Sequence, residues 1–132
     1  MITIFYAGLL AILYVGLTLF VAEGRFKHRV GLGDGGIPAL TQRIRVHANF
    51  AEYVPFALLL IYMVDNSDYS PILVHTLGIL LVTGRVLHIW GILSTPNTSF
   101  GRMVGTCVTM FVFMICAVLL IWKFLILRMT GL

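Results

Sequence analysis

Residues 102 to 127 read RMVGTCVTMFVFMICAVLLIWKFLIL, and Lys123 is the only charged side chain after Arg102 in this stretch. A helix of about 20 apolar residues is long enough to cross the hydrocarbon layer of a membrane. The stretch is therefore predicted to be a membrane-spanning helix. Three similar stretches precede it, at about residues 2–22, 41–64 and 71–92. Together they predict an all-α membrane protein, a bundle of four transmembrane helices.

The composition agrees with this assignment. Of the 132 residues, 60% are hydrophobic and 11% are charged, whereas soluble domains are about 45–50% apolar and about 25% charged. Four spans and short connections use nearly the whole chain, which predicts a single transmembrane domain over residues 1–132. The two cysteines, Cys107 and Cys116, match no metal-binding or disulfide spacing. They are expected to be free thiols in the core, and no metal site is predicted.

The basic residues gather at the ends of the apolar stretches. Nine Lys and Arg residues against five Asp and Glu give a net charge of +4. Those at the first and third connections are Arg25, Lys27, Arg29, Arg43, Arg45, Arg85 and Arg102. On the other side lie Lys123 and Arg128. Positive residues favour the cytoplasmic side, so both termini are predicted to lie outside. The distribution is typical of topology signals, and no nucleic-acid binding is expected.

Small residues recur at helical spacing at the start of the last apolar stretch. Gly101, Gly105 and Thr109 follow one another at intervals of four residues. This spacing is typical of membrane helices that pack closely. Gly78, Gly84 and Gly91 in the third stretch are expected to serve the same packing.

The second predicted helix carries polar side chains in its first half. At 100° per residue, Asn49 lies about 40° from Arg45, and Glu52 lies about 20° to the other side. Tyr53 lies about 80° from Arg45. A cation, an amide, an anion and a phenol thus share one helical face. His47 points about 200° away from Arg45, so it is expected to pack elsewhere.

Further basic residues are predicted at the same side of the membrane. Arg85 and His88 share a face near the end of the third helix, and Arg102 begins the fourth. Two interpretations account equally well for Arg45 and Glu52: an ion pair that holds helices together, and a ligand site. The ion pair explains the whole set less well, because the cations outnumber the single acid. Surplus buried cations point to an anionic ligand or to lipid head groups.

These residues form a pattern that resembles a known family. Arg45-x-His47-x-Asn49-x-x-Glu52-Tyr53-x-Pro55 resembles the second-helix signature of the MAPEG superfamily, the membrane-associated proteins in eicosanoid and glutathione metabolism. Gly84-Arg85-x-x-His88 and Arg102 resemble its other recurrent positions. The Gly-Asp-Gly-Gly loop at residues 33–36 resembles that of its small bacterial members.

The resemblance implies an assembly, a ligand and an activity. It implies a left-handed four-helix bundle assembled as a homotrimer, with glutathione between neighbouring subunits near the cytoplasmic membrane face. The family includes glutathione transferases and peroxidases, leukotriene and prostaglandin synthases, and a lipoxygenase-activating protein that binds lipid without catalysis. The expected protein is a glutathione transferase of the bacterial inner membrane that acts in detoxification, with glutathione peroxidase activity as a further expectation.

The resemblance also implies roles for single residues. Glutathione carries two carboxylates and one ammonium, so several cations and one acid suit it. The expected glutathione-binding residues are Arg29, Arg45, Asn49, Glu52, Tyr53, Arg85 and His88. Arg102 is the expected catalytic residue, because a cation beside the sulfur lowers the thiol pKa and favours the thiolate. The thiolate would attack an apolar electrophile or a lipid hydroperoxide that arrives from the bilayer.

Two other functions stay open at this point. Several family members carry tyrosines near the end of the third helix, where this chain has His88 and Ile92. A non-catalytic scaffold that binds membrane lipids or a thiol is therefore the first alternative. Buried charge also suggests a small transporter or channel, but the charges lie at one end of the helices rather than along them.

Overall fold

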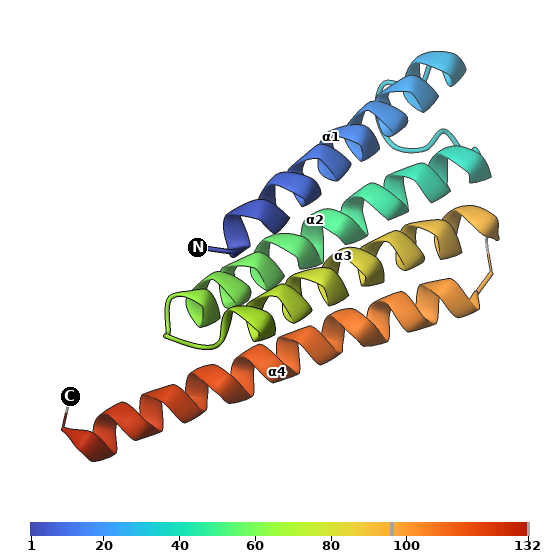
Figure 1. The fold of residues 1–132 in the computed structure, drawn as a ribbon. Helices are drawn as coiled ribbons and strands as arrows, with labels where there is room; N and C mark the ends of the chain where they lie inside the picture. The colour runs from blue at the N-terminus through green and yellow to red at the C-terminus, as the bar shows by residue number, and fades with distance from the viewer. Residues whose placement is uncertain (96, 132) are drawn as a thin grey trace.

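The structure is a computed structural model that describes residues 1–95 and 97–131. Four helices run up and down: α1 (Thr3–His28), α2 (Pro38–Asp65), α3 (Pro71–Ser94) and α4 (Phe100–Thr130), with both termini at the same end of the bundle (Figure 1). All four are long and apolar enough to cross a membrane. The all-helical architecture predicted from the sequence is confirmed. Its left-handed twist and its homotrimeric assembly stay predictions.

The first helix is longer than its apolar stretch. It continues past Ala22 to His28, because the polar residues that follow Ala22 are compatible with helix and need no membrane around them. Arg29 ends it in the left-handed conformation, with φ of 54°. The backbone N–H of Val30 then donates to the carbonyl of Arg25 at 3.0 Å, a bond that satisfies a carbonyl at the helix terminus.

The second helix begins earlier than residue 41. Pro38 is its first residue, a position where a missing N–H costs nothing and the fixed φ of proline suits a helix. Thr41 therefore lies within the first turn. Its hydroxyl donates to Asp34 Oδ2 at 2.8 Å, which attaches the preceding loop to the helix.

Helices α3 and α4 approach each other through small residues. A Cβ atom added at Gly105 would lie 2.7 Å from the backbone nitrogen of His88, and one added at Gly101 would lie 2.9 Å from the carbonyl oxygen of Leu87. Such distances are shorter than van der Waals contact, so only glycine allows these two backbones to lie this close. Gly84 and Gly91 face the same contact. The packing role predicted for these glycines is confirmed. Gly78 also lies at a close contact, but against α1, because a Cβ atom added there would overlap the Tyr6 ring.

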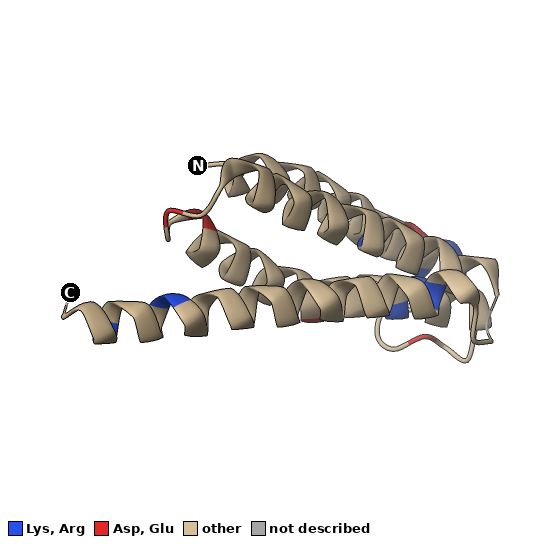
Figure 2. Cartoon of the chain, turned by 60° about the horizontal axis from the view of Figure 1, so that its bottom comes forward, with Lys and Arg blue, Asp and Glu red and all other residues tan. Residues whose placement is uncertain are grey.

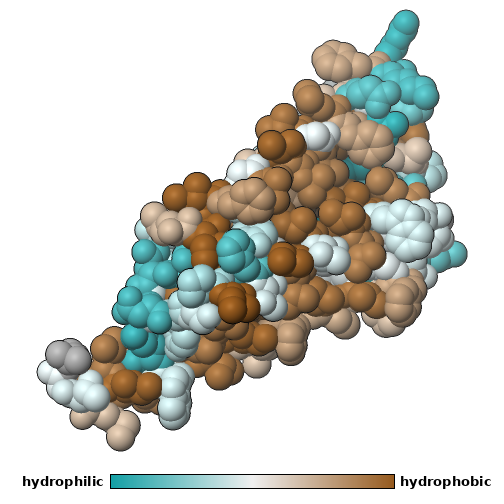
Figure 3. All heavy atoms as spheres, viewed as in Figure 1, coloured by the Kyte–Doolittle hydropathy of each residue, from teal (hydrophilic) through white to brown (hydrophobic). Residues whose placement is uncertain are grey.

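The apolar side chains divide between a core and an outer surface. Ala57, Ile61 and Leu81 are fully buried among the helices, whereas Ile12 is 74% exposed and Val118 is 60% exposed. Figure 3 shows an apolar surface across the middle of the molecule, with hydrophilic residues at the end of α1 and around the α2–α3 turn. Hydrocarbon chains are the natural environment of such a surface.

The two cysteines are free but differ in burial. Cys116 is buried, as expected, whereas Cys107 is exposed. The prediction that both lie in the core is therefore wrong for Cys107. The stripe of buried small residues on α4 faces α3, and Cys107 lies on another side of that helix.

Charged residues cluster at one end of the bundle. Figure 2 shows most Lys and Arg residues near the α1–α2 and α3–α4 connections, away from the termini. We call this end of the bundle the basic end. Its placement on the cytoplasmic side stays a prediction from the positive-inside rule.

We expect Gly105→Ala to destabilise the bundle, because the added methyl group meets backbone atoms of α3 that cannot rotate away. Overpacking of this kind typically costs about 1–3 kcal/mol. Thermal unfolding in detergent, followed by circular dichroism, should show a lower midpoint. Gly8→Ala is the matched control, because a Cβ atom at Gly8 meets nothing within 4 Å. Equal midpoints for the two variants would contradict the close α3–α4 contact.

Candidate functional site

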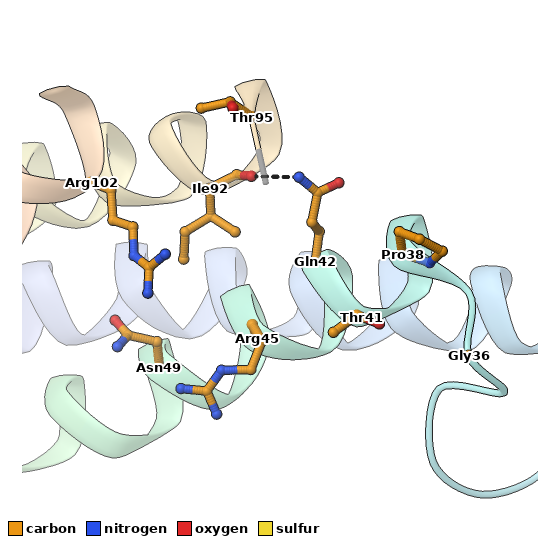
Figure 4. Close-up of a pocket in the computed structure, with 9 residues that line it drawn as sticks. All are labelled: Gly36, Pro38, Thr41, Gln42, Arg45, Asn49, Ile92, Thr95 and Arg102. Atoms are coloured by element: carbon orange, nitrogen blue, oxygen red, sulfur yellow. Dashed lines mark hydrogen bonds between the residues drawn. The ribbon is translucent and has the colours of Figure 1, made fainter. Parts of the chain in front are cut away.

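A cavity of about 360 Å³ opens at the basic end, within the size range of small-molecule sites. We call it the basic pocket. Its lining residues are Gly36, Pro38, Thr41, Gln42, Arg45, Asn49, Ile92, Thr95 and Arg102, drawn in Figure 4. They come from the α1–α2 loop, from the first turns of α2, from the end of α3, from the α3–α4 connection and from the start of α4. The cavity therefore exists only because the two connections meet at one end of the bundle.

The lining offers positive charge and neutral hydrogen-bonding groups. Arg45 and Arg102 supply two guanidinium groups, and Figure 4 shows Arg102 extending from α4 toward Asn49 on α2. None of the lining residues is acidic. The two ion pairs in the described part of the chain, Arg43–Glu23 and Lys123–Asp68, involve neither arginine. The pocket therefore favours an anionic ligand.

Arg85 lies behind this pocket rather than in it. The residue is 2% exposed, and its Nη1 donates to Asn49 Oδ1 at 3.1 Å. Its Nη2 donates to the Gly105 carbonyl at 3.0 Å and also to the Thr109 hydroxyl. Its guanidinium carbon lies 5.6 Å from the centre of the Tyr53 ring. Arg85 therefore reaches the pocket through Asn49, whose amide it orients, and direct binding of a ligand by Arg85 stays a prediction.

His88 supports the first turn of α4. The residue is buried, and its Nδ1 lies 3.1 Å from the Arg102 carbonyl oxygen and 3.1 Å from the Thr106 hydroxyl. A carbonyl can only accept, so this geometry places the proton on Nδ1. At the other end of the same turn, Ser99 Oγ accepts the backbone N–H of Arg102 at 3.3 Å. His88 and Ser99 thus hold the backbone that carries the Arg102 side chain.

Two of the predicted site residues lie apart from the pocket within one chain. Glu52 is exposed and is not among the lining residues, and it forms no ion pair with Arg45 or with any other residue that the structure describes. Arg29 lies beyond the end of α1, where it lines a separate depression together with Arg25 and Phe26. The structure therefore brings together Arg45, Asn49 and Arg102, with Arg85, Tyr53 and His88 behind them.

Sequence reasoning missed other residues of the pocket. Gln42 precedes Arg45 by one helical turn, and its Nε2 donates to the Ile92 carbonyl at 3.0 Å, which fastens α2 to the end of α3. Its spacing from Arg45 could have indicated it. Gly36 and Thr95 belong to connections, and no periodic signal places a connection beside a helix. His47, in contrast, was correctly placed on another face, because its Nε2 lies 3.1 Å from the Thr18 hydroxyl on α1.

Comparison with known proteins identifies the family of this chain. The MAPEG family pattern matches residues 3–122. The inner membrane protein YecN of Escherichia coli K12 is 36% identical over 91 residues, which cover 69% of this chain and 70% of that protein. The YecN protein of E. coli strain CFT073 matches over the same length with the same identity. With a family pattern that covers nearly all of its four helices, this chain belongs to the MAPEG family.

Proposed function

We propose that this protein is a membrane-bound glutathione transferase that activates glutathione as a thiolate for attack on apolar electrophiles. One observation carries the proposal. The basic pocket holds two guanidinium groups without acidic partners in the described part of the chain, yet none of its lining residues is a cysteine, histidine, serine or acid. Apart from the hydroxyls of Thr41 and Thr95, the lining holds no nucleophile. The proposal therefore assigns the nucleophile to the ligand, and cations are the groups that stabilise it.

Binding would use the charge and the hydrogen-bonding groups of the pocket. Arg45 suits a carboxylate, because a guanidinium can donate two parallel hydrogen bonds to it. Asn49 is held by Arg85 through its Oδ1, which leaves its NH₂ group available to a second acceptor. Gln42 and Thr41 add neutral polar groups at the side of the pocket near the loop. These groups match a peptide ligand with two carboxylates.

Activation would fall to Arg102. A thiol with an ordinary pKa of about 8.5 is only a few per cent ionised at neutral pH, and each unit by which its pKa falls corresponds to about 1.36 kcal/mol. A guanidinium beside the sulfur supplies such stabilisation. The thiolate then forms a carbon–sulfur bond with the electrophile, and the leaving group departs with the bonding electrons. With a lipid hydroperoxide, two glutathione molecules give one disulfide, an alcohol and water.

The surroundings of Arg102 suit an apolar second substrate. Phe100 is 76% exposed and Met103 is 54% exposed, and both flank Arg102 at the start of α4. A hydrophobic electrophile dissolved in the bilayer would meet these side chains before it reached the pocket. Enrichment in the membrane raises its local concentration, so a membrane-embedded site favours apolar substrates over water-soluble ones.

Location and assembly belong to the same proposal. The relationship to an E. coli inner membrane protein and the four apolar helices support a multi-pass protein of the inner membrane. The positions of the basic residues favour both termini outside, which would place the basic pocket at the cytoplasmic face. A homotrimer, which the family resemblance implies, would cover the exposed Glu52 and Arg29 with a neighbouring subunit. Both residues would then join glutathione binding at the subunit boundary.

We expect Arg102→Ala to abolish thiolate formation while the protein still binds glutathione. Rapid mixing of wild-type protein with glutathione at neutral pH should produce ultraviolet absorbance of a thiolate. The variant should lose this signal, together with about tenfold or more of its activity with a chloro-aromatic electrophile, as a pKa shift of one to two units requires. Arg128→Ala is the matched control, since it removes an exposed arginine at the far end of α4. A thiolate signal that survives in Arg102→Ala would contradict the assigned role.

Arg45→Ala should weaken the binding of glutathione more than it slows the reaction of glutathione once it is bound. A hydrogen bond to a charged group contributes about 1.5–3 kcal/mol, so the dissociation constant for glutathione should rise about 10- to 100-fold. Isothermal titration calorimetry in detergent measures this directly. Arg45→Lys keeps the charge but not the planar pair of donors, and it should show an intermediate loss. Unchanged affinity in Arg45→Ala would remove this residue from the site.

A non-catalytic scaffold that binds lipids or a thiol is the second candidate function. The observation that favours it is the presence of Ile92 in the pocket lining, because an isoleucine offers no hydroxyl to a thiolate or to Arg102. Under this alternative the wild-type protein binds glutathione or copurifies with a lipid, yet shows neither thiolate absorbance nor turnover. Mass spectrometry of lipids retained by the purified protein, with and without added glutathione, separates the two functions.

A further inference from the structure

A second depression adjoins the basic pocket on the side of the α1–α2 loop. It has a volume of about 320 Å³, and its lining residues are Arg25, Gly33, Asp34, Thr41, Ile44 and Arg45. We call it the loop depression. Thr41 and Arg45 line both cavities, so a ligand bound to Arg45 can extend from one cavity into the other.

Asp34 brings a negative charge to this depression. Its Oδ2 accepts the Thr41 hydroxyl at 2.8 Å, and its Oδ1 accepts the backbone N–H of Gly36 at 3.0 Å. These bonds lower the pKa of the Asp34 carboxyl below its ordinary value, with the Gly36 N–H as the largest cause, so the group is ionised at neutral pH. Both donors are neutral. Neither ion pair in the described part of the chain includes Asp34, so the charge lacks a cationic partner there.

The other acids of the chain are placed differently. Glu23 is paired with Arg43, and Asp68 with Lys123. Asp65 accepts the backbone N–H and the hydroxyl of Thr3 at the end of the bundle opposite the pocket. Glu52 is exposed and lines neither cavity. Asp34 is thus the acid that meets the ligand-binding region within one chain.

Two arginines, Arg25 and Arg45, and one aspartate line the loop depression, and Arg45 together with Asp34 matches an α-amino acid group. Such a group carries a carboxylate and an ammonium on the same carbon, so its two charges lie close together. Arg45 suits the carboxylate and Asp34 suits the ammonium, and each charged hydrogen bond is stronger than a neutral one. The basic pocket, whose lining includes no acid, offers no negative charge to an ammonium.

We propose that Asp34 is a ligand-binding residue that takes the free α-ammonium of the bound peptide, with Arg45 on the carboxylate of the same amino acid group. The inference rests on the proposed function and adds the orientation of the bound glutathione. The γ-glutamyl end of glutathione lies in the loop depression, and the thiol lies toward Arg102 in the basic pocket. It also defines a specificity: the site selects thiol peptides that have a free α-amino group.

The test compares two ligands on the full chain in detergent by calorimetry. One ligand is glutathione, and the other is its analogue that lacks only the α-amino group. Wild-type protein should bind glutathione about tenfold or more tightly than the analogue, as expected for one charged hydrogen bond. Asp34→Asn, which keeps the shape of the side chain, should lose this preference by binding glutathione more weakly while its affinity for the analogue stays the same.

One control variant and one competing variant make the result specific. The control, Asp68→Asn, removes an exposed acid at the opposite end of the bundle and should keep the full preference for glutathione. The competing variant is Glu52→Gln, because Glu52 is the other acid that the proposed function places near glutathione. If Glu52→Gln removes the preference and Asp34→Asn does not, the ammonium is bound by Glu52 and the inference is wrong. Equal weakening of both ligands by Asp34→Asn would also overturn it, because Asp34 would then only hold the loop.

The outcomes separate this inference from the proposed function. If wild-type protein binds glutathione and Arg45→Ala weakens that binding, while Asp34→Asn leaves the preference intact, the inference fails and the proposed function stands. If wild-type protein binds neither ligand, glutathione is not its ligand, and both the proposed function and the inference fall.

Discussion

The close approach of the α3 and α4 backbones is the constraint on which the rest of the site depends. Glycines at 101 and 105 remove the side chains that would separate the two helices. Only at this short separation can the Arg85 guanidinium reach the Gly105 carbonyl on α4. The same approach brings the His88 ring against the Arg102 carbonyl. A packing feature with no chemistry of its own therefore determines where the chemical groups lie.

The three central arginines differ because their environments differ. A charge taken out of water needs hydrogen bonds for its donors. The two terminal nitrogens of Arg85 find them in an amide, a carbonyl and a hydroxyl on α2 and α4, whereas its Nε has no partner among the described residues. Arg85 therefore holds helices together and orients Asn49. Arg45 and Arg102 remain exposed at the pocket without acidic partners in the part of the chain that the structure describes. They are the cations that an anionic ligand can use.

The loop between α1 and α2 also contributes to the site. It is attached to α2 through the bond from Thr41 to Asp34 and to α1 through the bond from Arg25 Nη1 to the Gly31 carbonyl at 3.0 Å. Positive φ angles at Gly33, Gly35 and Gly36 allow the tight path that these bonds require. The segment is therefore a wall of the ligand region as well as a connection, and it carries the acid that the basic pocket lacks.

The sequence by itself determined the four membrane spans, the packing glycines and the shared face of Arg45 and Asn49, because hydropathy and helical spacing are local properties. It also determined the family, through the motif on the second helix. Only the tertiary structure decided that Arg85 and His88 are buried behind the pocket, that Glu52 lies outside it and that Asp34 lies beside it. Burial and proximity depend on which faces of different helices meet, and on where a loop folds back. Neither property has a period along the chain, so neither can be read from one sequence.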